Sequence, residues 1–70
     1  MGTKTVYFLQ EYDPQRGLVD GMYRYSPMFS SEELAKQAKD TVKAPTLALV
    51  EAMLNDEGVL SRKVILEILE

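Results

Sequence analysis

The chain has no cysteine and no histidine, and each absence excludes a class of function. Without cysteine, neither a disulfide framework nor a thiolate metal site can form. Without histidine, the commonest general base at neutral pH and the commonest zinc ligand are both missing. We therefore expect no metal and no cofactor.

The length of seventy residues predicts one small domain over 1–70. Apolar residues make up 46% and charged residues 27% of the sequence, a composition typical of a globular protein. A chain of this size buries only about 60% of the surface that its unfolded form exposes, so its margin of stability is small. Because disulfides and a cysteine or histidine metal site cannot stabilise it, self-association or a larger partner is expected.

The net charge of −3 is concentrated in residues 44–70, and lysine and arginine form no cluster. Phosphate backbones are bound by clustered basic side chains, so direct binding of DNA or RNA is not expected. No apolar run approaches the length of a membrane-spanning helix, and no stretch has the pattern of a signal peptide. The sequence thus predicts a cytoplasmic protein that does not contact a membrane.

Residues 4–12 are rich in aromatic and β-branched side chains, which predicts a strand in the interior of a sheet. Alternation divides its apolar side chains into two sets, Val6, Phe8 and Tyr12 on one face and Tyr7 and Leu9 on the other. Turn-forming residues follow at 13–17. A second strand is predicted over 22–26, or from as early as Leu18, and ends at Pro27. The two strands would form an antiparallel hairpin.

A helix is predicted to begin at Ser30, which can cap the first turn, with Glu33 completing a capping box. Pro45 disfavours helix at the residue before it, so this helix should end near residue 43. A second helix is predicted over 47–54, where one glutamate interrupts an apolar run. Because that helix would be apolar nearly all round, it would pack on two sides or present one side to a partner.

The last apolar stretch, 62–70, fits a strand better than a helix, because three β-branched residues follow soon after a glycine stop. A helix would instead align Leu60, Val64 and Ile68. The predicted fold class is α+β, a three-stranded and mainly antiparallel sheet with two helices packed on one face. The expected order of elements is β-β-α-α-β.

Candidates for catalysis are few. Nucleophilic catalysis would need a serine or threonine activated by lysine or a carboxylate, and each serine has a simpler reading as a helix cap or a strand end. Two acidic pairs could in principle bind a divalent ion. Glu32-Glu33 fits the start of a helix, where negative charge is favoured, and Asp56-Glu57 fits a turn without the ligand spacing of a calcium loop. The sequence therefore predicts a protein that is not an enzyme.

All six aromatic residues lie within 7–29, on the predicted hairpin and its exit. Tyrosine and arginine are enriched among binding hot spots, although cross-strand tyrosine pairs can also serve only to stabilise a hairpin. The functional interpretation is an outward aromatic face that binds a partner. Its members would be Tyr7, Tyr12, Tyr23, Arg24 and Tyr25.

Two motifs carry a resemblance to known proteins. The Val-Tyr-Phe-Leu sequence at 6–9, followed by Phe-Ser-Ser-Glu-Glu-Leu-Ala at 29–35, resembles small phage and bacterial β-β-α(-α)-β proteins of unassigned function. More distantly, Leu-Gln-Glu at 9–11 and Tyr-Arg-Tyr at 23–25 are similar to the layout of phage uracil-DNA glycosylase inhibitors. That similarity implies a small, cofactor-free protein that acts in the host cytoplasm by occluding another protein.

The leading hypothesis is a non-enzymatic protein-binding module, of which a phage-encoded inhibitor or modulator of a host or defence protein is one form. The first alternative is an assembly protein that forms a homodimer through the apolar helix 47–54, with Leu49 and Met53 as dimer contacts. The second alternative is a protein that stacks single-stranded nucleic acid on the aromatic rings of the hairpin.

Overall fold

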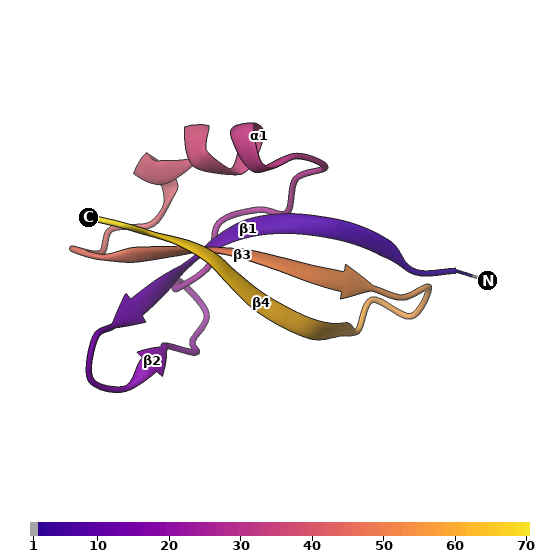
Figure 1. The fold of residues 1–70 in the computed structure, drawn as a ribbon, viewed down its shortest axis with the longest axis horizontal. Helices are drawn as coiled ribbons and strands as arrows, with labels where there is room; N and C mark the ends of the chain where they lie inside the picture. The colour runs from indigo at the N-terminus through magenta and orange to yellow at the C-terminus, as the bar shows by residue number, and fades with distance from the viewer. Residues whose placement is uncertain (1) are drawn as a thin grey trace.

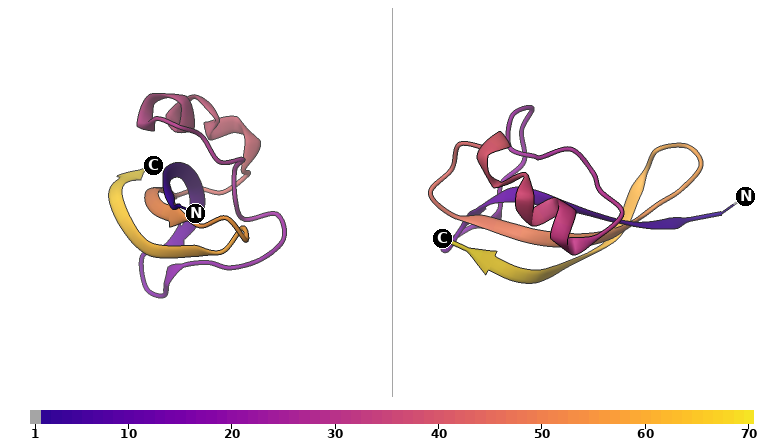
Figure 2. Two further views of the ribbon diagram at one scale, coloured as in Figure 1. Left: turned by 90° about the vertical axis from the view of Figure 1, so that its right-hand side faces the viewer. Right: turned by 90° about the horizontal axis from the view of Figure 1, so that it is seen from above.

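The computed structural model describes residues 2–70, which form one antiparallel sheet with a short helix on one face (Figure 1). The strands lie in the order β2-β1-β3-β4. Their bounds are β1 Lys4–Asp13, β2 Gly17–Leu18, β3 Leu47–Leu54 and β4 Leu60–Leu69, and the helical elements are α1 Glu32–Gln37 and the 3-10 turn η1 Lys39–Thr41. Viewed from the end, the sheet curls into a half-barrel (Figure 2).

The expected first strand is confirmed as β1, which lies between β2 and β3. Its two apolar faces pack into two separate core clusters, as alternation predicts. Phe8 is fully buried on one face and Leu9 on the other, where the helix covers the sheet. The turn after β1 is also confirmed, because Gly17 has a φ of 88° and the Arg16 amide donates to the Asp13 carbonyl.

The expected helix over 47–54 is wrong, because these residues form the strand β3. The strand pairs with β1 along one edge and with β4 along the other, so its backbone is satisfied on both edges. Leu47 and Leu49 pack under α1, whereas Ala48, Val50 and Ala52 pack on the opposite face. A strand buried on both faces has a continuous apolar sequence, which periodicity alone does not distinguish from a buried helix.

The expected strand over 22–26 is wrong as well, since β2 contains only Gly17 and Leu18. Residues 19–29 run irregularly along the edge of β1 and touch it through two isolated bridges, at Tyr25 and at Phe29. The serine hydroxyl of Ser26 takes the place of a backbone acceptor, because it accepts the Leu9 amide over 2.8 Å. The tertiary fold therefore satisfies this edge of β1 without a regular second strand.

The expected helix is present but much shorter than predicted. It begins after Ser31 rather than Ser30, and the Ser31 hydroxyl accepts the Leu34 amide over 3.2 Å. After Gln37 the chain tightens into η1 and leaves the helical path at Val42. Only Ala35, Ala38 and Val42 are buried in this region, so the apolar stripe is too narrow to hold a longer helix.

The position of the helix cap can be tested by a pair of serine variants. Replacing Ser31 with alanine should lower the free energy of unfolding by about 1 kcal/mol, because the Leu34 amide loses its acceptor. Replacing the exposed Ser30 with alanine should change it by less than about 0.5 kcal/mol. Urea unfolding followed by circular dichroism measures both. A larger loss for Ser30→Ala than for Ser31→Ala would place the cap at Ser30.

The last strand, expected over 62–70, is confirmed as β4. The fold class as a whole is nevertheless wrong, because the sheet has four strands and a single short α-helix rather than three strands and two helices. The difference comes from β3, which was expected to be the second helix. Across residues 2–70, no helix is both long and apolar enough to cross a membrane.

Candidate protein-binding surface

The segment after β2, called here the loop 19–25, is held against the end of β1 by backbone hydrogen bonds. The Val19 amide donates to the Glu11 carbonyl over 2.9 Å at the start of the loop. The Glu11 amide donates to the Arg24 carbonyl over 2.9 Å near its end. One residue of β1 therefore joins both ends of the loop.

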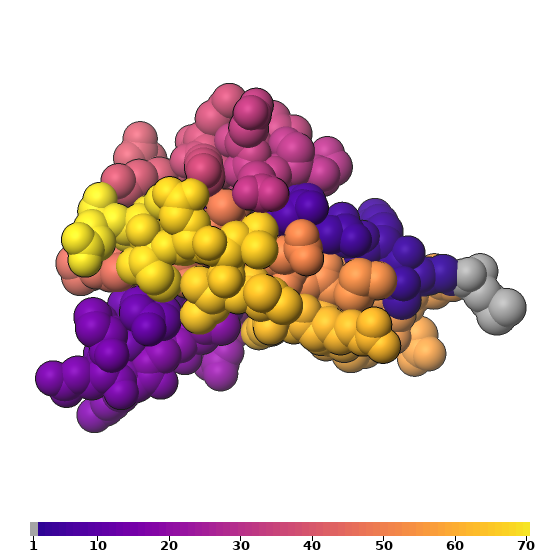
Figure 3. All heavy atoms as spheres, in the orientation of Figure 1, coloured from indigo at the N-terminus to yellow at the C-terminus, as the bar shows by residue number. Residues whose placement is uncertain are grey.

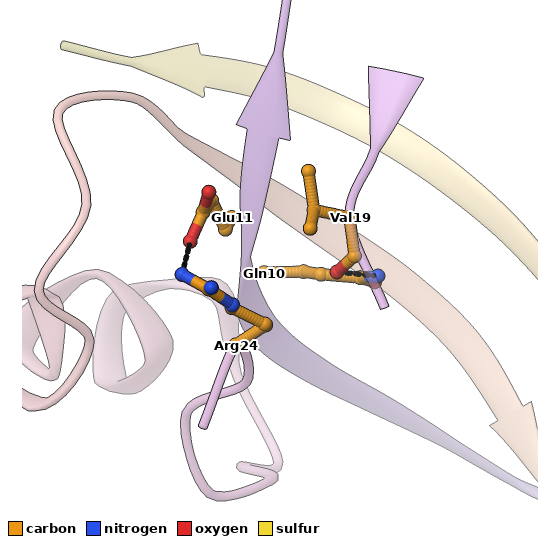
Figure 4. Close-up of polar contacts among 4 residues, drawn as sticks. All are labelled: Gln10, Glu11, Val19 and Arg24. Atoms are coloured by element: carbon orange, nitrogen blue, oxygen red, sulfur yellow. Dashed lines mark hydrogen bonds and ion pairs between the residues drawn. The ribbon is translucent and has the colours of Figure 1, made fainter. Parts of the chain in front are cut away.

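Gln10 fixes the start of the same loop from inside the protein. Its side chain is fully buried, and Nε2 donates to the Val19 carbonyl over 2.9 Å (Figure 4). The same nitrogen reaches Asp20 Oδ1 at 3.4 Å, whereas Oε1 has no hydrogen-bond partner among the described residues. A buried amide is costly unless it is bonded, so Gln10 favours the one loop position that supplies its acceptors.

Two further side-chain contacts close the loop. Arg24 Nη1 lies 2.6 Å from Glu11 Oε1 in an ion pair that is partly open to solvent (Figure 4). The Tyr25 hydroxyl donates to Asp20 Oδ1, and this hydrogen bond, with a smaller effect of burial, raises the pKa of Tyr25. The phenol therefore stays protonated to a higher pH than an ordinary tyrosine, and its contact is lost only as the pH rises past this raised pKa, above the ordinary value of about 10.

The tip of the loop presents two large side chains to solvent. Met22 is 84% exposed and Tyr23 is 83% exposed. Gly21 before them has a φ of 152°, and a Cβ there would lie 3.0 Å from Arg24 Cγ. The tip thus requires glycine at this position, and its backbone is set by contacts that involve neither Met22 nor Tyr23.

The five aromatic and arginine residues predicted as a partner-binding face do not share one face. Tyr23 and Arg24 are exposed on the loop, whereas the Tyr25 ring is half-buried with its centroid 6.0 Å from that of Phe8. Tyr12 is half-buried against the same core cluster. Tyr7 lies on the opposite face, beside the helix. The structure therefore exposes Tyr23 and Arg24, packs Tyr12 and Tyr25 against one core cluster, and places Tyr7 on the opposite face.

The two residues predicted as dimer contacts have different environments. Leu49 is fully buried in the cluster under the helix, so it has no exposed surface with which to touch a second copy. Met53 is half-buried, and its sulfur accepts the hydroxyl of Thr5 over 3.7 Å. Neither residue contributes to an exposed apolar patch, because both belong to the central strand β3.

Sequence reasoning missed Met22 and Gln10. The Asp-Gly pair at 20–21 is a turn signal, and a large apolar residue directly after such a turn is a signal for an exposed tip. A lone glutamine inside an apolar strand is a signal for a buried polar contact. Neither signal identifies the partner of the side chain, which only the folded chain supplies.

No group of three or more acidic residues in the described part of the chain is arranged to hold a metal ion. Comparison with known proteins adds no further assignment. The chain matches no protein-family model, no curated protein sequence and no solved structure.

Proposed function

We propose that this chain is a non-enzymatic protein-binding module that contacts its partner through the tip of the loop 19–25. The observation that carries the proposal is the exposure of Met22 and Tyr23 on a loop whose backbone is already anchored. Large apolar and aromatic side chains contribute most of the binding energy in protein interfaces. The module would act by covering part of the surface of its partner.

The anchoring of the loop supports this proposal energetically. Ordering a flexible loop on binding reduces affinity, whereas a loop held in its bound shape avoids that loss. Gln10 and the Arg24–Glu11 ion pair hold the loop without using the side chains at its tip. Met22 and Tyr23 therefore remain free to be buried by a partner.

The surroundings of the tip suit a partner surface of mixed polarity. An open hollow beside Met22 and Tyr23 is also lined by Asp20, Thr41 and Lys43. Its acidic, hydroxyl and basic groups would form the polar rim around the apolar tip, the arrangement typical of protein interfaces. Rim charges of both signs would influence orientation and association rate more than affinity.

The test compares three immobilised baits in extracts of the source cell, with quantitative mass spectrometry of the retained proteins. The baits are the wild type, the double variant Met22→Ala/Tyr23→Ala, and Met28→Ala. Met28 is an exposed methionine beside the start of β1, away from the loop, and serves as the matched control. We expect one protein to be retained by the wild type and the control and lost from the double variant.

Titration calorimetry with that protein, once purified, then measures the effect directly. The double variant should bind at least about tenfold more weakly than the wild type, since two central side chains are truncated. Its circular dichroism spectrum and urea midpoint should match the wild type, because neither side chain is buried. If no retained protein depends on residues 22 and 23, the loop is not the binding surface.

A further inference from the structure

The two edges of the sheet are treated differently by the fold. The edge of β1 is covered from Tyr7 to Asp13 by residues 17–29, which include β2. Tyr7 and Phe29, for example, exchange two backbone hydrogen bonds of 2.8 and 2.7 Å. The opposite edge belongs to β4, and no strand in the described part of the chain pairs beyond it. One edge is therefore closed and the other is open.

The open edge is long and apolar. β4 has ten residues, and the eight from Ser61 to Ile68 are exposed. Its exposed apolar side chains are Val64, Ile65, Leu66 and Ile68. Figure 3 shows the atoms of β4, in yellow, covering much of the front of the molecule. An exposed strand of this kind offers backbone hydrogen-bonding groups and apolar surface to another strand.

We propose that β4 pairs antiparallel with β4 of a second copy of this chain. The pairing would join the two sheets into one continuous sheet across a two-fold axis. A second copy is favoured over a strand from another protein for two reasons. The charges of β4 are complementary to those of a second, antiparallel β4, and the resulting assembly contains two chains and no more.

The charge pattern of β4 selects the antiparallel orientation. Arg62 and Lys63 lie near the start of the strand, whereas Glu67 and Glu70 lie at or just after its end. Antiparallel pairing places the basic end of each strand beside the acidic end of the other, while parallel pairing places like charges together. Glu67 also bridges to Lys36 at 2.8 Å, but both side chains keep substantial exposure to solvent. The acidic end therefore remains accessible to a basic partner.

The arrangement of the sheet limits the assembly to a dimer. Once the two β4 edges meet, the remaining edge of each sheet is formed by the two-residue strand β2 and the irregular residues 19–29. That edge offers no long regular strand to a third copy. A two-fold contact of this type uses the same surface of both copies, so it adds no third chain. It would also bury apolar surface, which stabilises a chain of this size.

Sedimentation velocity on the full chain tests the proposal with two valine variants. The wild type should sediment as a dimer at about 100 μM protein and dissociate on dilution. Val64→Lys should weaken dimerisation by more than roughly tenfold, because it places a charge on the shared edge of both copies. Glu51 lies opposite Val64 in β3 and can pair with the new lysine, so the monomer should still fold. Val59→Lys is the matched control, since Val59 is 55% exposed and Val64 50%, but Val59 lies outside β4.

A charge exchange provides a second test that does not depend on Val64. Arg62→Glu should weaken the dimer by roughly tenfold, because the basic end of each strand loses its net positive charge and brings a carboxylate beside the acidic end of the other strand. The double variant Arg62→Glu/Glu70→Arg should restore it, since opposite charges again meet in the antiparallel pair. The dimer proposal is overturned if the wild type is monomeric at about 100 μM, which would leave the edge to a strand from another protein. The antiparallel orientation is overturned if the double variant dimerises no better than Arg62→Glu.

Discussion

Replacing Phe8 with alanine is expected to remove about half of the free energy of unfolding at 25 °C. Phe8 is fully buried at the centre of one core cluster, between Val6 and the small residues Ala48 and Ala52. Truncating a buried phenylalanine typically costs about 3–5 kcal/mol, because apolar surface is lost and a cavity remains. A chain of this length has a total stability of roughly 4–10 kcal/mol, so the loss amounts to about half of it. Circular dichroism against urea, at one fixed protein concentration, measures the change.

The matched control for this variant is Phe29→Ala. Phe29 is only half-buried and packs at the margin of the second cluster, so its truncation should cost clearly less than that of Phe8. Its backbone bonds to Tyr7 do not depend on the side chain. Equal losses for the two variants would contradict the assignment of Phe8 to the better-packed core.

The second large effect is expected for Ser26→Ala. The Ser26 hydroxyl is nearly buried, accepts the Leu9 amide over 2.8 Å and donates to the Pro27 carbonyl over 2.8 Å. Removing it leaves a buried backbone amide without an acceptor, which should cost about 1–3 kcal/mol. Urea unfolding measures the total loss.

Hydrogen exchange at the Leu9 amide provides the local measurement for Ser26→Ala. The amide should exchange faster in the variant than in the wild type, beyond the general acceleration seen at other core amides. Ser30→Ala, the same substitution at an exposed position, should leave both quantities unchanged. A stability loss below about 0.5 kcal/mol for Ser26→Ala would mean that the Leu9 amide finds another acceptor.

The first strand illustrates what local sequence can predict. Its faces follow from strict alternation, because side chains of a strand point in turn to opposite sides. Val6, Phe8, Tyr7 and Leu9 accordingly lie where alternation places them. The turn after β1 was also predictable, since Asp13 and Gly17 supply a local hydrogen bond and a positive φ. These features depend on neighbours within a few residues.

Sequence alone did not predict which of the proposed binding side chains are exposed, because exposure depends on distant residues. Tyr23 and Tyr25 have the same parity, yet the loop turns one ring out and the other toward Phe8. Lys63 from β4 lies with its Nζ 5.6 Å from the centroid of Tyr25, which no local pattern indicates. Odd and even positions point to opposite faces only in a regular strand, and the loop 19–25 is not a regular strand.

The sequence alone determined the limits of the chemistry and the local shape of β1 and its turn, because composition and alternation do not depend on the rest of the fold. The tertiary structure decided that 47–54 is a strand, because pairing with β1 and β4 satisfies its backbone, and two core clusters bury its two faces. It also decided that one edge of the sheet is covered while β4 stays open. Those outcomes depend on contacts between residues far apart in the sequence, which a stretch of apolar residues does not specify.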